Sequence, residues 1–396
     1  MKYILKAALL LQIIIYSPII LLIVIIWPLL RIRIGVIKSR SFGHIAIPEI
    51  YLCDKKFGLY KKNEIILWYH YKQIANKYLL KKRKEQLIFL PGILLHPIRI
   101  FFCKIKFFHK HIYYKVDYDH KGKKRMIYDK SRTNQEFLKK SESSIKFSHG
   151  EIVKGDDYLE KNFINNNDKI VLFASRSPLY RDENFISIRN SSIKTQVKSI
   201  KFVTENGYKA IRVGRDKIDQ FNIDTKKFFD YTFADHQSDF LDIYISSKAK
   251  FMVLGTTGLN ELATVMRIPE LLVDFTLFNI LADRFNEAYN PIILPKKIYS
   301  KVLERHLSYK EIFEKKLFDV NIISEIPNDF QLIDNSEDEI FEATQEMMEL
   351  VEHKLDLNGE RIKQNNFWNL QAKFYGVKEK MIISPSFFKK NNKLFI

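Results

Sequence analysis

The chain has 396 residues, of which 46% are hydrophobic and 28% charged, and it contains 13 Gly, 11 Pro and 2 Cys. This composition excludes collagen-like and mostly disordered chains, and two cysteines are too few for a disulfide framework or a four-cysteine zinc site. The charge is one-sided, because residues 1–150 hold 30 Lys and Arg against 9 Asp and Glu, whereas the other 246 residues hold 35 against 37. We therefore expect a polyanionic surface to face the first 150 residues, rather than a nucleic acid that binds a uniformly basic chain.

An apolar stretch without charge runs from residue 7 to residue 30, and four basic residues follow it between 31 and 40. Its length is enough to cross about 30 Å of hydrocarbon, and the basic residues behind it place the bulk of the chain in the cytoplasm. Pro18 lies inside the stretch, so two anchors stay open: a full transmembrane span, and a re-entrant or interfacial helix. A buried helix of a soluble protein is a third interpretation.

The pattern of residues 31–37 predicts a strand, and a glycine-containing turn and a helix follow it, which is how a doubly wound α/β domain begins. Residues 64–125 then combine basic and aromatic runs, for example at 68–71, 81–84 and 101–108. We interpret this region as a second membrane-facing surface. Nucleic-acid binding would use the same residue types, but a preceding membrane anchor argues against it; ordinary helices with solvated lysines are the other alternative.

Beyond a polar segment at 122–155, short apolar runs alternate with helical patterns. We predict strands at 169–174, 209–214, 250–255 and 269–275, and helices at 192–205, 239–247 and 258–266. Such alternation is typical of a parallel sheet with right-handed crossovers. Ser336 and Glu339 form a capping-box pattern at the start of an amphipathic helix.

The strongest local signal for a ligand is Gly255-Thr256-Thr257-Gly258, which follows a predicted strand and opens a predicted helix. Glycines allow a ligand to approach the backbone, and the amides and dipole of a helix N-terminus favour an anion. Glycine at such a turn can also have a purely steric reason. The segment matches neither the P-loop nor the dinucleotide fingerprint.

Arginines follow two of the other predicted strands. Arg176 comes after the strand at 169–174, and Arg212 and Arg215 flank Gly214 at the end of the next strand. Because open α/β sheets bind ligands at the carboxyl ends of their strands, these arginines are candidate ligands of a diphosphate. Surface salt bridges are the alternative for Arg215 and for Arg181.

The first predicted domain offers fewer candidates. His44, after Gly43, is either a general base or a packed, hydrogen-bonded histidine, and Glu49 has a weaker claim to the same role. Asp117-Tyr118-Asp119 matches the Asp-x-Asp of metal-dependent sugar transferases, but it lies in a basic tract without a strand pattern, so we interpret it as a chance match. The sequence thus favours metal-independent handling of phosphate by arginines and backbone amides.

An ordered set of segments carries a resemblance to a known family: Ser41-Phe42-Gly43-His44 with Glu49, Arg189-Asn190-Ser191, 238–244 leading into 255–259, 294–297 and 307–312. With these motifs the chain resembles bacterial glycosyltransferases of surface-polysaccharide gene clusters, which have a GT-B architecture. It is more distantly similar to fucosyltransferases with a GT-B core. Where the family has His-Val-Arg-Asp, this chain has Ala174-Ser175-Arg176-Ser177, so it keeps the arginine alone.

The resemblance implies an α/β protein with two Rossmann-like parallel-sheet domains. The expected parts are a membrane anchor at 1–30, a basic acceptor domain at 31–160, a nucleotide-sugar domain at 161–330 and a helical tail at 331–396. The implied activity is transfer of a sugar from a nucleotide-activated donor to a lipid-linked or surface glycan in the biosynthesis of cell-surface polysaccharide, such as lipopolysaccharide, O-antigen or capsule. Inversion and retention of the anomeric centre both stay open. Two rivals stay open as well: a phospho-sugar transferase acting on the same glycan, and an inactive membrane-bound scaffold.

The resemblance and the residue patterns together assign roles. The donor diphosphate is assigned to Arg176, Arg212, Arg215, Gly255, Thr256, Thr257 and Gly258; the acceptor side to Gly43 and Arg189; and the catalytic base to His44 or Glu49. We expect no metal or other cofactor. The expected partners are the nucleotide sugar, the lipid-linked acceptor and an anionic membrane surface. The expected location is the inner (cytoplasmic) membrane of a bacterium, with the catalytic domains facing the cytoplasm.

Overall fold

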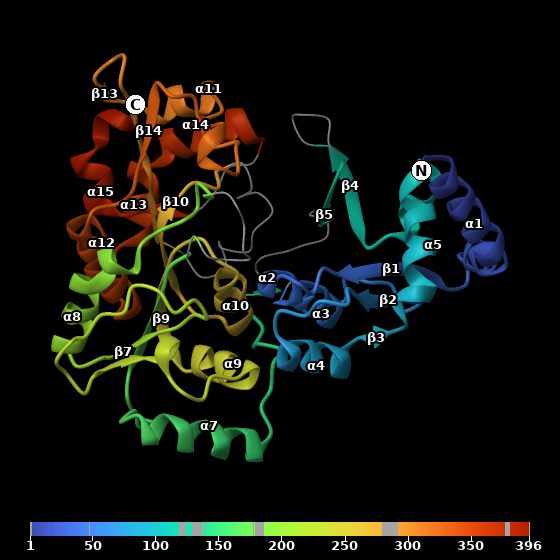
Figure 1. The fold of residues 1–396 in the computed structure, drawn as a ribbon, viewed down its shortest axis with the longest axis horizontal. Helices are drawn as coiled ribbons and strands as arrows, with labels where there is room; N and C mark the ends of the chain where they lie inside the picture. Colours follow the sequence, from blue (N-terminus) through green and yellow to red (C-terminus); the bar gives the residue numbers. More distant parts are fainter. Residues whose placement is uncertain are drawn as a thin grey trace. The chain divides into compact units, whose positions relative to one another are not determined.

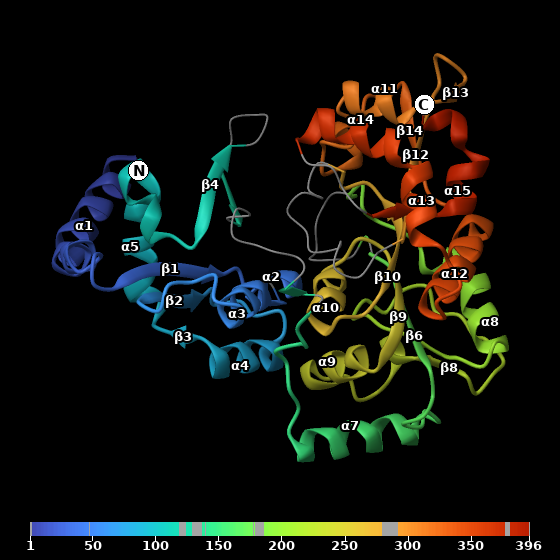
Figure 2. The same ribbon diagram turned by 180° about the vertical axis from the view of Figure 1, so that it is seen from behind.

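The computed structural model describes residues 2–46, 48–118, 124–128, 137–138, 140–176, 178, 186–278, 292–376 and 381–395, with the backbone alone for 2–13, 114–118 and 124–128. The chain forms two compact units, Met1–Ser144 and Ile145–Ile396 (Figures 1 and 2). We call them the N-terminal unit and the C-terminal unit.

The division falls before the boundary at 160/161 that the sequence favours, because helix α7 (His149–Lys161) belongs to the C-terminal unit. Asp156 of α7 accepts hydrogen bonds from the Tyr244 hydroxyl at 2.5 Å and from the Lys248 amino group at 2.8 Å. Tyr244 lies on α9 (Asp239–Ser247). A Cβ at Gly155 would come within 2.2 Å of the Tyr244 ring, so this glycine permits the close approach of α7 to α9.

The N-terminal unit is built on a parallel sheet of the order β1-β2-β3, with β1 at Arg31–Ile37, β2 at Glu64–His70 and β3 at Ile88–Phe89. Gly35 stands opposite Trp68 in the register of β1 and β2. A Cβ at Gly35 would lie 2.6 Å from the Trp68 ring, so glycine makes room for the buried indole. The predicted strand at 31–37 is confirmed.

Helices and a hairpin complete this unit. They are α1 (Lys2–Ile25), α2 (Phe42–Ala46), α3 (Glu49–Lys56), α4 (Lys77–Gln86), α5 (Gly92–Lys104), the 3-10 helix η1 (Lys106–His111), and the antiparallel pair β4 (Tyr114–Tyr118) and β5 (Lys124–Tyr128). Helix α1 packs against α5, where Ile20 and Ile23 are buried and the Tyr16 hydroxyl donates to the Ile93 carbonyl at 2.9 Å.

The prediction of a transmembrane helix within residues 1–30 is not supported. Among the helices of the described residues, none is both long enough and apolar enough to span a bilayer.

The interpretation of residues 64–125 as a membrane-facing surface is wrong for its central aromatic residues. Trp68 and Tyr69 are 0% and 2% exposed in β2, and Phe102 is fully buried in α5. These rings form the core of the N-terminal unit, because β2 is the middle strand of the sheet and is covered on both sides. The run between 64 and 70 is a buried strand whose pattern the surrounding charges obscured.

The C-terminal unit holds a seven-stranded sheet in the order β15-β11-β10-β9-β6-β7-β8, and each neighbouring pair is parallel. The strands are β6 (Ile170–Ala174), β7 (Lys209–Arg212), β8 (Phe228–Asp230), β9 (Ala249–Leu254), β10 (Glu270–Phe275), β11 (Ile292–Pro295) and β15 (Ile382–Ile383). If the strands from β6 to β11 are numbered 1 to 6 along the chain, their order across the sheet from β8 to β11 is 3-2-1-4-5-6. This is the doubly wound order, and the direction of the order reverses between β6 and β9. The predicted α/β class with parallel sheets is confirmed.

Besides α7 and α9, this unit has the helices α8 (Val197–Glu205), α10 (Leu259–Met266), α11 (Tyr309–Glu314), α12 (Glu337–Val351), α13 (Leu357–Lys363), α14 (Asn365–Tyr375) and α15 (Pro385–Lys390). The 3-10 helix η4 (Ile193–Gln196) directly precedes α8. A small antiparallel sheet has the order β13-β12-β14, with strands at Arg305–His306, Lys297–Ser300 and Phe330–Ile333. The capping box of Ser336 and Glu339 is confirmed at the start of α12.

Residues 331–396, expected as a helical tail, are integrated into this unit. Helix α12 packs on α8, where the Thr344 hydroxyl bonds the Ser199 hydroxyl at 3.0 Å. Strand β15 pairs with β11 and extends the main sheet. The segment is thus helical, but it also closes one edge of the sheet.

Candidate functional site

The carboxyl ends of β6 and β9 form the centre of the candidate site in the C-terminal unit, since the strand order reverses between them. Three sequence-predicted segments meet here. The Gly255 amide donates to the Ala174 carbonyl at 2.8 Å, the Ser191 amide donates to the Arg176 carbonyl at 3.1 Å, and the Arg176 amide donates to the Ser191 hydroxyl at 3.3 Å. Open α/β sheets bind ligands at such a reversal point.

Gly255 has a packing reason to be glycine. A Cβ there would lie 2.4 Å from the Ser191 hydroxyl oxygen and 3.2 Å from the Arg176 amide nitrogen. The glycine therefore lets the turns after β6 and β9 touch, which places the Arg176 backbone beside the Gly255-Thr256-Thr257-Gly258 loop. The Arg176 side chain is buried, with the residue 6% exposed.

Buried polar atoms gather at these strand ends without a hydrogen-bond partner among the described residues. They are Thr256 Oγ1 after β9, Gln196 Oε1 beside β6, and Asp274 Oδ2 and Thr276 Oγ1 at the end of β10. Gln196 is held by its amide group, which donates to the Ala174 carbonyl at 3.3 Å. Burying an unsatisfied polar atom costs about 1–3 kcal/mol, so such a concentration indicates a place where a polar ligand completes the bonding.

The loop itself satisfies part of its own hydrogen bonding. The Thr257 amide donates to Asn260 Oδ1 at 2.7 Å, and the Leu259 amide donates to the Thr257 hydroxyl at 3.2 Å. Thr257 therefore keeps its hydroxyl hydrogen for donation, whereas Thr256 has both hydroxyl functions available within the described residues.

A buried lysine directly follows β11 and pairs with a half-exposed aspartate. The Lys296 amino group donates to the Asn190 carbonyl at 2.6 Å and pairs with Asp334 at 2.7 Å, and its residue is 1% exposed. Burial raises the pKa of Asp274 to about 7, and the nearby Lys296 offsets part of this rise. Lys296 thus ties the 189–191 turn to the end of β11 and fixes its position beside Arg176.

Arg212 and Arg215, which the sequence analysis places at the donor diphosphate, both contact carboxylates of the protein. Arg212 is 4% exposed, pairs with Asp230 at 3.1 Å and donates to the Asp219 carbonyl at 2.9 Å, so it holds the segment between β7 and β8. Arg215 is half-exposed and binds two carboxylates of α9, Asp239 at 3.0 Å and Asp242 at 2.6 Å.

In the N-terminal unit the two candidate bases lie in different environments. His44 is exposed on the short helix α2, next to the buried Gly43. Glu49 is 3% exposed at the start of α3, where it pairs with Arg83 at 3.1 Å and accepts the Ser144 amide at 2.9 Å. Arg83 also donates to the carbonyls of α2, at Ile45 and Ala46. This network gives Glu49 a structural role that accounts for its burial.

The remaining candidates are placed in part. Arg189 lies half-buried in the 187–191 turn, and its amide donates to the Ser187 hydroxyl at 3.3 Å. Asp117 lies on β4, whereas Asp119 and Arg181 lie outside the described residues.

Sequence reasoning gave no site role to Gln196, Asp274 or Lys296. Asp274 has a signal in hindsight, because it is an acidic residue that follows three apolar ones near the end of a strand. Lys296 directly follows the apolar strand β11, which the sequence analysis did not recognise.

No protein-family model matches the chain, and no curated protein matches it. Among solved structures, a glycosyl transferase family 9 protein from Veillonella parvula DSM 2008 has a TM-score of 0.46 and 10% identity, covering 81% of this chain and 98% of that one. E. coli ADP-heptose LPS heptosyltransferase II has a TM-score of 0.34, 11% identity and coverages of 61% and 84%. E. coli heptosyltransferase WaaC with ADP has a TM-score of 0.33, 14% identity and coverages of 61% and 87%. These low scores assign neither a family nor an activity to this chain.

Proposed function

We propose that the chain is a GT-B-type glycosyltransferase and that its C-terminal unit binds a nucleotide-activated sugar at the carboxyl ends of β6 and β9. The observation that carries the proposal is the meeting of Arg176, Ser191 and Gly255 at the point where the strand order reverses. Buried hydroxyl and amide oxygens without described partners surround this point. A diphosphate supplies both negative charge for an arginine and several acceptor oxygens for hydroxyl donors.

The proposed chemistry follows from the charge that develops on the leaving group. A departing nucleoside diphosphate gains negative charge in the transition state, so a buried, fixed guanidinium at Arg176 stabilises the transition state more than the ground state. The hydroxyl of Thr256 donates a further hydrogen bond to the same group. In this proposal no metal ion is required for the departure of the diphosphate.

The rest of the proposal concerns the acceptor. The N-terminal unit binds a lipid-linked glycan at an anionic membrane surface on the cytoplasmic side, in the assembly of a cell-surface polysaccharide. Its support is the excess of basic residues in the first 150 positions. His44 is the candidate base toward the acceptor hydroxyl, because it is exposed, whereas Glu49 is held by Arg83.

The test compares Thr256→Val with Thr344→Val in nucleotide binding, measured by titration calorimetry with a panel of nucleoside diphosphates. Thr256→Val removes a buried hydroxyl without a described partner, so stability is kept while affinity falls about tenfold. Thr344→Val is the matched control, because its hydroxyl is bonded to Ser199 and to the Ile340 carbonyl, far along the chain from the loop. It lowers stability and leaves affinity unchanged.

The same titration separates the rival functions. An inactive scaffold shows no saturable binding of any nucleoside diphosphate. A phospho-sugar transferase does bind nucleotides, but it transfers the sugar together with a phosphate. Mass spectrometry then finds a product that is heavier, by one phosphate, than the product of sugar transfer alone. If Thr256→Val binds every nucleotide as the unaltered chain does, the site at the ends of β6 and β9 is wrong.

A further inference from the structure

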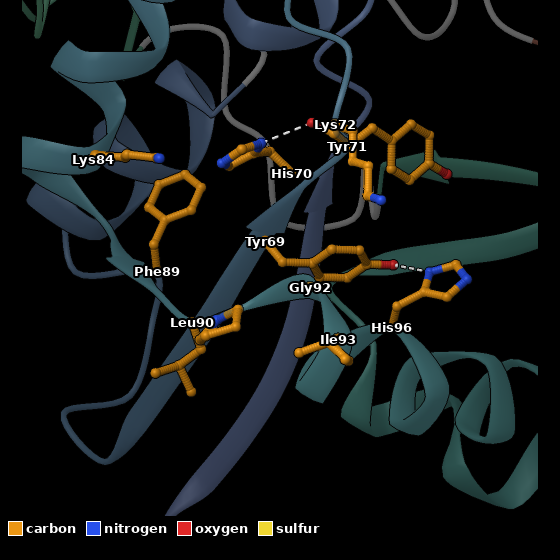
Figure 3. Close-up of a pocket in the computed structure, with 11 residues that line it drawn as sticks. Tyr69, His70, Tyr71, Lys72, Lys84, Phe89, Leu90, Gly92, Ile93 and His96 are labelled. Carbon is orange, nitrogen blue, oxygen red and sulfur yellow. Dashed lines mark hydrogen bonds between the residues drawn. The ribbon is translucent and has the colours of Figure 1, made fainter. Parts of the chain in front are cut away.

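A pocket of about 830 Å³ opens in the N-terminal unit, at the carboxyl ends of β2 and β3 and the first turns of α5 (Figure 3). Its lining residues belong to the N-terminal unit alone, and none of the sequence-predicted site residues is among them. Its walls combine aromatic rings with Lys72, Lys84 and two histidines, and the described residues that line it include no acidic side chain.

One side of the pocket is a cationic and aromatic cluster. The Lys84 amino group lies 5.9 Å from the centre of the Phe89 ring, and the His70 and Phe89 ring centres are 6.1 Å apart. Figure 3 shows Lys84 and His70 pointing toward one another above Phe89. This arrangement presents the Lys84 cation beside an apolar ring, which suits an anionic group attached to an apolar or sugar moiety.

The other side is held by a neutral pair. Burial raises the pKa of the Tyr69 hydroxyl well above its usual value, and burial together with Arg99 lowers the pKa of His96. The hydroxyl of Tyr69 and Nδ1 of His96 share a hydrogen bond at 2.9 Å. This bond fixes the His96 ring on the pocket wall.

Cations also crowd the neighbouring strand end. Lys38 directly follows β1, and the last residue of β1, Ile37, pairs with His70 of β2. Burial and the charges of Arg99 and Arg40 lower the pKa of Lys38. A site that already concentrates positive charge gains from an anion, since the anion relieves the repulsion among the cations.

An apolar surface adjoins the pocket. Ile93, on the pocket wall, is 80% exposed, and its carbonyl accepts the Tyr16 hydroxyl of α1. Among residues 14–25 of α1, whose side chains the structure describes, the most exposed large apolar ones are Ile14, Ile15, Leu21, Leu22 and Ile25, each between 57% and 67% exposed. They lie on the face of the helix turned away from Tyr16 and from the buried Ile20 and Ile23. The hydrogen bond from Tyr16 thus places α1 beside the rim of the basic pocket, where Ile93 is the exposed apolar residue.

From this juxtaposition of a basic pocket with an exposed apolar residue at its rim we propose that the pocket binds the phosphate head of a lipid phosphate, whose hydrocarbon tail leaves the pocket over Ile93. Lys72 and Lys84 neutralise the phosphate, and the aromatic walls contact the group next to it. The inference deepens the proposed function, because only that function makes the bound lipid an acceptor; the binding itself is tested without transfer.

The test titrates the full chain with farnesyl phosphate, and with farnesol and inorganic phosphate as probes of tail and head alone, by calorimetry. Farnesyl phosphate should bind saturably and at least tenfold more tightly than either part. Lys72→Gln with Lys84→Gln should weaken it at least tenfold. The matched control removes two exposed lysines of the same unit outside the pocket, Lys61→Gln with Lys62→Gln, and should stay within twofold.

The tail has its own pair of variants. Ile93→Asp should weaken farnesyl phosphate about fivefold or more and leave the melting temperature in place, because Ile93 is 80% exposed. Val302→Asp, at a 71% exposed position in the C-terminal unit, should have no effect. Three results would each overturn the proposal. They are an equal loss of affinity for farnesyl phosphate in both pairs of lysine variants, an affinity for inorganic phosphate equal to that for farnesyl phosphate, and an unchanged affinity for farnesyl phosphate in Ile93→Asp. Nucleotide titration of the same variants keeps the two proposals distinguishable, since it reports on Thr256 and the C-terminal unit.

Discussion

Two buried polar clusters, the one around Glu49 in the N-terminal unit and the one around Thr256 in the C-terminal unit, differ in how the protein compensates them. In the N-terminal unit, Glu49 meets Arg83 and the Ser144 amide, so the carboxylate is compensated by the protein itself. In the C-terminal unit, Thr256, Thr276 and Gln196 bury oxygens for which the described residues supply no partner. Because a buried polar atom without a partner destabilises the fold, the first arrangement indicates stability and the second indicates ligand binding.

The largest expected effect breaks the compensated network. Glu49→Ala should destabilise the protein by about 3–5 kcal/mol, because it leaves the guanidinium of Arg83 buried without its carboxylate. Urea unfolding followed by circular dichroism measures the loss. A variant that keeps its stability but loses transfer at saturating substrate would restore Glu49 as the catalytic base.

The next effect concerns the candidate donor site of the C-terminal unit. Arg176→Ala should slow sugar transfer roughly 10–200-fold, since a charge-assisted hydrogen bond is worth about 1.5–3 kcal/mol, and Arg176→Lys should recover little, because lysine lacks the planar fork. Arg215→Ala is the matched control: its half-exposed pairs with Asp239 and Asp242 stabilise by about 1 kcal/mol or less, and nucleotide affinity should not change. Near-normal transfer by a folded Arg176→Ala would place the donor elsewhere.

A further effect sharpens the comparison through pH. Burial raises the pKa of Asp274 to about 7, against about 3.9 in an unfolded chain. Between these values the folded state holds a proton that the unfolded state has lost, so this group makes stability fall as pH rises from about 4 to about 7. Asp274→Asn should flatten that slope, by up to about 4 kcal/mol across the window, since one pKa unit corresponds to about 1.36 kcal/mol.

The N-terminal unit holds a comparable acid. Burial also raises the pKa of Asp54, in α3 of the N-terminal unit, to about 7. Asp54→Asn should therefore remove a separate part of the same slope, and the double variant should remove both parts. An unchanged pH dependence of unfolding in Asp274→Asn would show that Asp274 is ionised in the folded protein.

The smallest expected effect is that of removing metal ions, which we expect to leave activity unchanged. Transfer should persist within twofold in EDTA, because the proposal assigns the leaving diphosphate to an arginine, a hydroxyl and backbone amides. Loss of activity that Mg²⁺ or Mn²⁺ restores would favour the Asp117–Asp119 pair and contradict the interpretation of that motif as chance. Added Mg²⁺ without EDTA serves as the control for inhibition by trace metals.

The C-terminal unit was predictable because its short apolar strands alternate with helical patterns, so β6, β9 and β10 fall within one residue of the predicted ranges. In the N-terminal unit β1 was predictable. Strand β2 was not, since the basic residues around Trp68 and Tyr69 concealed a buried strand. Arg212 shows that contacts between residues far apart in the sequence could not be predicted. Its partner Asp230 lies on the neighbouring strand β8, and only the register of the folded sheet brings the two together. Two-residue strands such as β15 carry no readable pattern at all.

Strand β15 has a consequence for synthesis on the ribosome. It covers the edge of β11, whose four residues are all buried, yet it is translated only after the helices α12, α13 and α14. Until then the nascent sheet presents an apolar edge with unpaired backbone groups, which is the kind of template that invites pairing with another chain. The emerging polypeptide is thus most vulnerable to aggregation in the interval between the emergence of β11 and that of β15, and chaperone dependence should be concentrated in that interval.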